Sequence, residues 1–540
     1  MFKRPIFAVL LGLTVILPAS IRAADEKASK SNDKPGVFLR FSALDHLRAD
    51  FRYLGEVVGE GEKAKQLDEL ITSKLGEKGL ESLDVKKPIG AYGWIGPFGI
   101  DSKAVILIPI AKEKAFVDLL SDTLDAKPEK GKDDVYTLNV DNLPFPIFFR
   151  FVNGYAYVTL RDKEVLDKDK LLTPEVVLPG AQIGTASFTV NIDEIPDDLK
   201  EKSLAVIENQ LAGLKDKEMP THSEAQKKFR DAAVDELSAQ VKSLFKNGGT
   251  TTLRLDLDRK DGDVSLTMSM AAKSGSPLAS KIRDLGQIKS WTAALLHPDS
   301  ALRLELNAVL PEKLRQLLAP ALQDAEKQVL AKAKNEDERE VIKPLVEGVM
   351  PTLKAAEVDT AIDLRGPGDN SLYTGVVGIK IKDGTKMERG FLKTAAKFPK
   401  RIDLDAEKAD RVNIHRIKLG KEDLDRDTRR LFGDNPIYVA FRDDVLLVSF
   451  GEKGLDALKE ALTATPRTGK VTELQLMLPR LVPLFNDPKQ GDIARQVFGN
   501  DTNSGRVRLS VEGGDSLTLR LALKAKLIDY LNRVDKAKKE

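Results

Sequence analysis

The spacing of apolar residues along the chain alternates between two periods. Apolar residues three and four positions apart, typical of one face of a helix, occur in residues 204–214, 229–244 and 314–325. In residues 253–257 and 264–270 the period falls to two, and the turn KDGD between them favours a tight connection. Together these patterns predict an α+β fold, in which antiparallel sheets have helices packed on one face.

The order of these patterns recurs, which predicts internal duplication. The segment FPIFFRFVNGYAYV from Phe145 matches NPIYVAFRDDVLLV from Asn435, and IGAYGWIGPFG matches AIDLRGPGDN. We therefore expect two homologous halves, 37–290 and 300–540. Each half divides again into two units of strand, helix, helix, hairpin and helix. The four units begin near Val37, Ala186, Ala301 and Val471.

The stretch PIGAYGWIGPFG, residues 88–99, has a glycine at every third position. A phosphate-binding loop needs a strand, a glycine turn and then a helix whose N-terminus meets the phosphate. Here the turn leads into KAVILIPIA, which is a strand pattern. The stretch therefore predicts the first strand of a hairpin, in which Gly90 and Gly93 admit a closely packed neighbour or a bulge.

Residues 1–23 have the layout of a secretory signal peptide. Two basic residues precede an apolar run over residues 6–17, and Ala23 ends a cleavage motif. Residues 24–36 are small, polar and charged, which predicts a disordered leader. We expect an exported protein, periplasmic or extracellular, with no transmembrane anchor after cleavage.

Composition excludes several kinds of chemistry. The 540 residues include no cysteine, which excludes disulfides, thiol catalysis, thiolate metal sites and a lipid anchor on cysteine. The formal charge is +2, and it becomes −1 without the three basic residues of the signal peptide. Acidic and basic residues are interspersed, so the chain has no long-range attraction for nucleic acid or an anionic membrane.

The titratable residues form no recognisable catalytic or metal motif. The four histidines lie in four different elements, and His46 lies between Asp45 and Asp50. That group is either a one-histidine, two-carboxylate site or a solvated helix end, and the second is favoured. The segment DLDRKDGD, residues 256–263, departs from a calcium loop in spacing, which favours a charged hairpin tip. We expect no metal and no cofactor, and we assign no catalytic residue.

Aromatic residues gather in the first half of the chain. Their presence on both faces of a strand predicts burial on both sides, or one face covered by a ligand or partner. Internal burial is the favoured interpretation. The candidates for a partner or ligand surface are Tyr92, Trp94, Phe148, Phe149, Phe151, Tyr155 and Tyr157.

In its order of repeats and style of hairpins, the mature chain resembles large exported bacterial proteins of unknown function built from paired α+β repeats. The resemblance implies an architecture and transfers no functional residue. We expect a soluble, non-enzymatic binding or scaffolding protein of the bacterial envelope, whose partner is an unidentified envelope protein or an apolar ligand. Two alternatives stay open: a carboxylate-dependent hydrolase, and a periplasmic carrier of lipids or other apolar ligands. A filled core favours scaffolding, and an open apolar groove favours carriage.

Overall fold

The computed structural model describes most of the chain, and the chain forms two compact units. The described residues are 34–97, 102–141, 143–215, 223–297, 300–420, 422–485 and 487–539. The predicted signal peptide and nearly all of the predicted leader lie outside them. Unit 1 comprises Met1–Ala205, Phe245–Ser274 and Ala522–Arg533, and unit 2 comprises Val206–Leu244, Gly275–Leu521 and Val534–Glu540. Each unit contains helices and antiparallel strands, which confirms the predicted α+β class.

The sheet of unit 1 has the strand order β10–β9–β8–β1–β2–β3–β7–β6–β5–β4, and every printed pair is antiparallel. Its strands are β1 (Val37–Phe41), β2 (Ile89–Trp94), β3 (Lys103–Pro109), β4 (Glu129–Lys130), β5 (Tyr136–Leu138), β6 (Ile147–Val152), β7 (Tyr155–Leu160), β8 (Ala186–Asn191), β9 (Gly248–Asp258) and β10 (Asp263–Ala272). Its helices include α2 (Leu44–Val57), α3 (Gly61–Ser82), α4 (Glu113–Leu124), α5 (Pro174–Val177) and α6 (Gly180–Ile183).

The sheet of unit 2 has the order β15–β16–β17–β18–β14–β13–β12–β20–β21, again antiparallel throughout. Its strands are β12 (Leu302–Val309), β13 (Glu357–Arg365), β14 (Thr374–Lys380), β15 (Ile402–Ala409), β16 (Val412–Ile417), β17 (Ile437–Phe441), β18 (Val445–Gly451), β20 (Thr472–Met477) and β21 (Arg506–Glu512). A separate two-stranded ladder pairs β11 (Lys289–Ser290) with β19 (Arg467–Thr468).

The remaining helices include the three that the apolar periods predict. They are α7 (Asp197–Lys215), α8 (Glu224–Asn247), α9 (Pro277–Leu285), α10 (Glu312–Ala331), α11 (Glu336–Ala355), α12 (Gly384–Ala395), α13 (Arg426–Phe432), α14 (Gly454–Leu462), α15 (Leu478–Leu481), α16 (Pro488–Phe498) and α17 (Ala525–Lys539). Helices α7, α8 and α10 cover the three stretches predicted to be helical.

Helix α8 shows how a local signal sets a boundary. The sequence THSE suggests a capping box from Thr221 to Glu224, but Thr221 lies outside the described residues. In the structure the reciprocal pair lies two residues further along: Ser223 Oγ accepts from the Gln226 backbone amide at 3.3 Å, and Gln226 Oε1 accepts from the Ser223 backbone amide at 2.9 Å. The helix ends at Asn247, and strand β9 begins at the next residue, a glycine.

One order of elements occurs four times along the chain when short 3-10 turns are left aside. Each time a strand is followed by two helices and then by two strands. The four runs are β1–α2–α3–β2–β3, β8–α7–α8–β9–β10, β12–α10–α11–β13–β14 and β20–α15–α16–β21–β22, where β22 is Leu517–Lys524.

The glycine-rich stretch forms strand β2, as its pattern predicts. It pairs with β1 on one side and with β3 on the other, and strand β3 begins at Lys103, whereas a phosphate loop would lead into an α-helix. A Cβ added at Gly90 would lie 2.6 Å from Leu178 Cδ2, so the absent side chain lets the segment after α5 pack against the strand. The tip of this hairpin, residues 98–101, lies outside the described residues.

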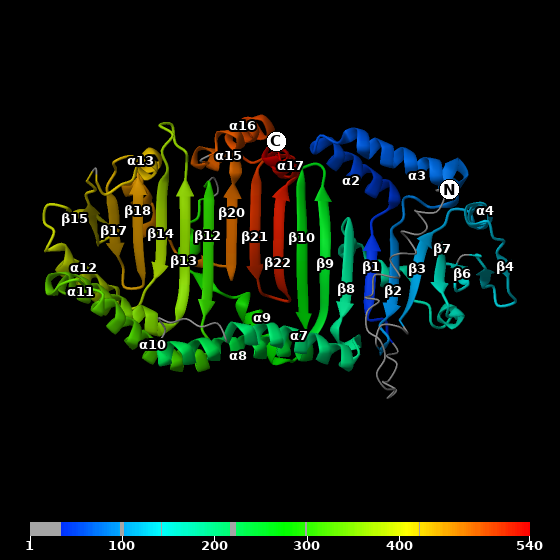
Figure 1. Ribbon diagram of the computed structural model, residues 1–540, viewed down its shortest axis with the longest axis horizontal. Helices are drawn as coiled ribbons and strands as arrows, with labels where there is room; N and C mark the ends of the chain where they lie inside the picture. The colour runs from blue at the N-terminus through cyan, green and yellow to red at the C-terminus, as the bar shows by residue number, and fades with distance from the viewer. Residues whose placement is uncertain are drawn as a thin grey trace. The chain divides into compact units, whose positions relative to one another are not determined.

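Helices of unit 2 lie mainly beyond the ends of its strands (Figure 1). Helices α10 and α11 run along one end of β12, β13 and β14, and α13 and α15 lie at the opposite end of the sheet. An apolar cluster fills the space on one side of this sheet, where α14 packs on β18 and β14. Its buried members include Val376, Ile414, Leu447 and Leu458.

Candidate functional site

Three neighbouring strands of unit 2 bury their polar residues and expose their apolar ones. On β13, Asp359 and Asp363 are 5% and 0% exposed, whereas Ile362 between them is 38% exposed. On β12, Glu305 is 4% exposed and its neighbour Leu306 is 39% exposed. Strand β20 alternates in the same sense, with its glutamate and glutamine buried and its leucines only partly buried. The usual placement of apolar and polar side chains is therefore reversed on this part of the sheet.

The apolar side chains of these strands align across the sheet. Residues directly opposite one another in an antiparallel pair project from the same face, with Cβ atoms about 4.5–5.5 Å apart. The central row, taken strand by strand, is Val439, Val448, Val377, Ile362, Leu304, Leu474 and Leu509. The flanking row is Phe441, Leu446, Ile379, Thr360, Leu306, Thr472 and Val511. We call the surface formed by these two rows the open face of unit 2.

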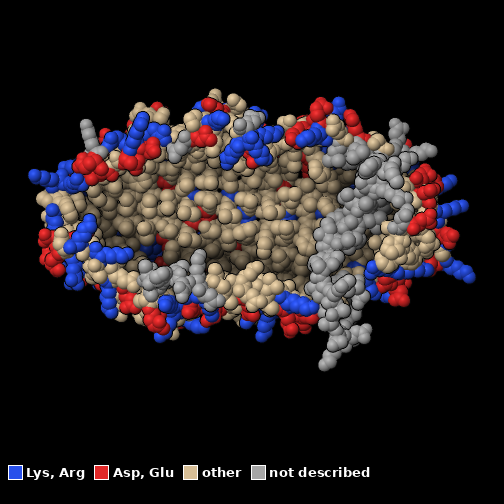
Figure 2. Space-filling model, in the orientation of Figure 1, with Lys and Arg blue, Asp and Glu red and all other residues tan. Residues whose placement is uncertain are grey.

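Figure 2 shows how charge is distributed around these strands. The surface over β12, β13 and β14 is hollowed and largely free of Lys, Arg, Asp and Glu, whereas the helices at the strand ends carry many of them. Helix α11 alone contains five acidic and three basic residues. Charged helices therefore flank an aliphatic floor.

Unit 1 has the same reversal on β8, β9 and β10. The exposed residues are Phe188, Leu253, Leu255, Leu266 and Met268, which are 38–44% exposed. They too are in register, because Leu253 lies opposite both Phe188 and Met268, and Leu255 opposite Leu266. Ser187, Thr189 and Ser265 alternate with them and are each 3% exposed. The period of two correctly predicts these strands, but their apolar face is not covered.

Buried carboxylates hold the covered face of unit 2. Asp359 accepts hydrogen bonds from Ser290 Oγ at 2.7 Å, Thr292 Oγ1 at 2.5 Å and the Trp291 amide at 3.1 Å. Asp363 accepts from the amide of His297 at 3.2 Å. The segment from 290 to 297 is thus fixed to the polar side of β13, because burial of these carboxylates requires partners.

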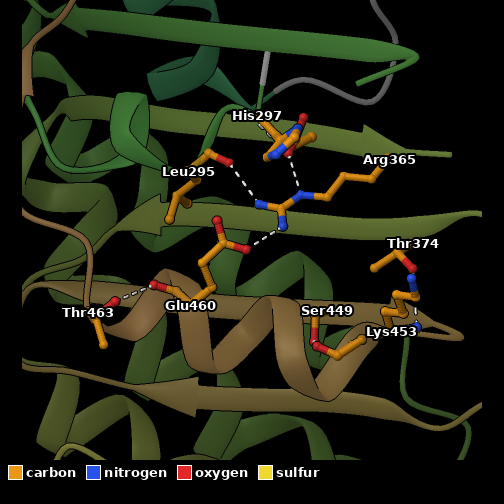
Figure 3. A network of polar contacts seen from close by, with 10 residues as sticks. Leu295, His297, Arg365, Thr374, Ser449, Lys453, Glu460 and Thr463 are labelled. Atoms are coloured by element: carbon orange, nitrogen blue, oxygen red, sulfur yellow. Dashed lines mark hydrogen bonds and ion pairs between the residues drawn. The ribbon is translucent and has the colours of Figure 1, made fainter. Parts of the chain in front are cut away.

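Arg365, at the end of β13, extends this network to α14 (Figure 3). Its guanidinium donates to Asp363 at 2.8 Å, to Glu460 at 2.6 Å and to the carbonyl of Leu295 at 3.2 Å. The largest effect on the Arg365 pKa is burial, which lowers it, but the two carboxylates outweigh burial and raise it. The network ties strand, helix and covering segment together.

Two carboxylates also face each other across β12 and β20. Burial raises the pKa of Glu305, and its neighbour Glu473 raises it further. Burial would also raise the pKa of Glu473, but ion pairs with Lys470 at 2.8 Å and Arg508 at 2.9 Å outweigh it and lower that pKa. Divergent pKa values are a feature of acid–base pairs. Here, however, both carboxylates are buried, and a Cβ at Gly469 would lie 2.7 Å from Glu305 Oε1, so the pair is covered rather than open to substrate.

The histidine group considered from sequence is a helix contact. His46 Nε2 lies 3.8 Å from Asp50 Oδ1, one turn along α2. Asp50 also pairs with Arg259 at 3.1 Å and accepts from Thr185 Oγ1 at 3.0 Å. Within the described ranges, no three histidine or carboxylate side chains are grouped closely enough to hold a metal ion. The segment of residues 256–263 forms the turn between β9 and β10, as predicted.

The aromatic candidates of the first half lie mainly in the interior of unit 1. Tyr92, Tyr155 and Tyr157 belong to one apolar cluster, against which Trp94 and Phe148 are partly buried. Phe149 is fully buried in a second cluster, and Phe151 packs partly buried against it. Burial raises the pKa of Tyr92 to about 12. The favoured interpretation, internal burial, describes these residues better than a surface does, because Tyr92, Phe149, Tyr155 and Tyr157 are at most 5% exposed.

The sequence alone does not reveal the open face. Its alternation is plain in the sequence, but alternation does not say which face is covered. The charged residues of β12 and β13 would normally be placed outward.

No helix among the described residues is both long enough and apolar enough to cross a membrane.

Comparison with known proteins adds no relative from which a function could be taken. No family model matches this chain, and neither a curated protein nor a solved structure is significantly similar to it.

Proposed function

We propose that this protein is a carrier that holds an elongated apolar ligand, a lipid or a molecule of similar chemistry, on the open face of unit 2. The observation that carries the proposal is the reversed burial of β12, β13 and β20, where aliphatic residues are exposed and carboxylates are buried. Soluble proteins seldom expose contiguous apolar surface without a use for it in binding.

The sheet favours a ligand with few polar groups. The strands of the central row from β18 to β20 each have a partner on both sides, so their backbone groups are already hydrogen-bonded within the sheet. A peptide laid on them as an extended chain would find no edge to pair with. A lipid chain brings no backbone donors or acceptors, and aliphatic side chains are sufficient to bind it.

The proposal replaces scaffolding as the leading function. A filled core would favour scaffolding, whereas unit 2 has an exposed apolar face, which favours carriage. Catalysis by carboxylates is not favoured, because Glu305 and Glu473 are covered. We further propose that the carrier is exported, on the strength of residues 1–23, and that it consists of four copies of one unit. The fourfold recurrence of strand, two helices and two strands supports this duplication.

Extraction of the purified mature protein, followed by mass spectrometry of the extract, tests the proposal directly. We expect a co-purifying lipid in stoichiometric amount. The double variant Leu306→Gln/Ile362→Thr should lose it, and Val329→Thr should retain it. Val329 is a matched control because it is 44% exposed but lies on α10, away from both rows.

The expected loss of affinity follows from the exposed area. Full burial of a leucine or isoleucine side chain contributes about 1.5–3 kcal/mol. A ligand on the open face would bury the roughly two fifths that is still exposed, or about 0.6–1.2 kcal/mol for each residue. The double variant should therefore bind at least about sevenfold more weakly. Equal lipid content in all three proteins would refute the proposal.

A further inference from the structure

A pocket of about 420 Å³ lies at one end of the open face in unit 2. This volume falls within the range typical of ligand sites. Helices α11 and α12 form its roof, and strands β17 and β18 form its floor. Its lining is entirely apolar and consists of Leu345, Val346, Val349, Met387, Phe391, Val439, Phe441, Leu446 and Val448.

The floor of the pocket is continuous with the open face. Val439 and Val448 are the first two members of the central row, and Phe441 and Leu446 are the first two of the flanking row. The next members in register, Val377 and Ile379, belong to β14. With strands about 4.8 Å apart, the central row from Val439 to Leu509 extends over roughly 29 Å. The pocket is therefore the roofed end of a longer apolar path.

A buried histidine lies beyond this end of the path. His415 on β16 is opposite Val439 and is fully buried. Its Nδ1 accepts from the Asp405 amide at 3.2 Å, and its Nε2 lies 3.3 Å from Glu388 Oε1. Both ring nitrogens are thus occupied by protein groups. The end of the path offers a ligand no polar partner from this histidine.

The roof is held close by small residues. A Cβ added at Gly390 on α12 would lie 2.4 Å from the carbonyl oxygen of Pro344 on α11. A Cβ at Gly348 would lie 3.1 Å from the Cα of Met387. The two helices therefore approach each other directly.

Size and chemistry together select the occupant. A helix is about 10 Å across and rises 5.4 Å per turn, so a single turn already fills roughly 420 Å³. An extended peptide would bring amide and carbonyl groups into a lining without hydrogen-bond partners for them. A linear hydrocarbon chain avoids both problems.

We infer that the pocket takes the methyl end of one unbranched alkyl chain, as in a long-chain fatty acid, with the rest of the chain along the central row. This inference rests on the proposed function, because it assigns the substrate class of the same open face. It makes the roofed end a measure of chain length, since each methylene that reaches it should tighten binding about fourfold.

Fatty acids of 8, 12 and 16 carbons, titrated into the full mature chain by calorimetry, provide the test. We expect wild-type affinity to rise with chain length. Val346→Trp on α11, which fills the pocket, should weaken binding of the 16-carbon acid at least tenfold and abolish the gain from 12 to 16 carbons. Val329→Trp on α10 is the matched control and should bind as wild type. Val448→Phe fills the pocket from the opposite wall. It replaces Val346→Trp in the test if Val346→Trp does not keep the wild-type melting temperature.

The outcomes separate the two proposals. If Leu306→Gln/Ile362→Thr weakens binding but folded Val346→Trp does not, the ligand lies on the open face and the pocket inference is overturned. If the wild type binds none of the three acids, the pocket inference is overturned, and the co-purification test alone decides the proposed function. If an amphipathic helical peptide binds, no fatty acid does, and Val346→Trp abolishes peptide binding, then the pocket takes a helix and the inferred alkyl chain is wrong. If wild-type protein sediments as a dimer that Leu306→Gln/Ile362→Thr dissociates, a second copy covers the face and the inference also fails.

Discussion

The two sides of strand β13 should respond to substitution in opposite ways. Asp359→Ala removes a buried carboxylate that accepts three hydrogen bonds and leaves the fully buried hydroxyls of Ser290 and Thr292 without it. Hydrogen bonds to charged groups contribute about 1.5–3 kcal/mol each, and a buried donor left without its partner costs about 1–3 kcal/mol. We expect unit 2 to lose about 3–5 kcal/mol of unfolding free energy.

Ile362→Thr, three residues further along the same strand, should cost much less. Ile362 is 38% exposed, so only part of its 1.5–3 kcal/mol burial energy stabilises the fold. Threonine keeps the branched Cβ that suits a strand, and its hydroxyl faces solvent. We expect a loss of about 1 kcal/mol, because the variant removes the δ-methyl group and replaces one γ carbon with a hydroxyl on a side chain that is only partly buried.

Tryptophan fluorescence in urea measures both effects in unit 2. The chain has two tryptophans, and Trp94→Phe leaves Trp291, whose amide donates to Asp359. In that background the transition reports the segment that Asp359 holds, and its slope checks that the unfolded state has not changed. Asp359→Asn should fall between the two variants because it keeps the shape and one acceptor. If Ile362→Thr destabilised unit 2 as much as Asp359→Ala, the open face would be a covered core and the reasoning would be refuted.

Four further predictions concern other parts of the chain. Glu473→Gln should lower the unfolding free energy at pH 7 by about 1–3 kcal/mol, because a lowered folded pKa gives stability that is lost only as pH falls through it. Glu305→Gln should be neutral or stabilising at pH 8, because a raised pKa in the folded state makes ionisation of Glu305 costly as pH rises. Urea titrations at pH 7 and pH 8 measure the unfolding free energy of both glutamate variants, and equal losses in the two variants would contradict the assigned pKa directions. Gly390→Ala should lower the melting temperature, because its Cβ meets the Pro344 carbonyl, and an unchanged value by circular dichroism would show that α11 and α12 are not in close contact. N-terminal sequencing of the mature protein should begin at Ala24, and a start at Met1 would refute cleavage.

Local patterns in the sequence predict the elements of this fold well. Leu204 to Leu214 and Leu314 to Ala325 lie in helices because their spacing follows the helical period, which depends on neighbours in sequence. The hairpin of β9 and β10 follows from alternation and a turn for the same reason.

The open face could not be predicted, because it depends on contacts distant in sequence. Asp359 is buried only because residues 290–292, nearly 70 positions away, fold onto it. Nothing in the sequence EVDTAIDLR shows that its aspartates are covered by another segment of the chain and that its isoleucine is partly exposed. The aromatic residues of β6 and β7 attracted attention by their composition, yet most of them fill a core. Burial of a polar side chain is a property of its partners rather than of its own segment.

The pairing of β12 with β20 has a consequence for folding kinetics. Leu304 lies opposite both Ile362 and Leu474, so one side of β12 is completed by β13, which follows after α10 and α11, and the other by a strand 170 positions later. Contacts of such high order slow folding, because the chain entropy of a long loop must be lost before the contact forms. During synthesis from the N-terminus, one edge of β12 therefore remains unpaired until nearly nine tenths of the chain has left the ribosome. In that interval an aliphatic strand is exposed at both its side and its face, and we expect the nascent chain to need a chaperone most at this stage.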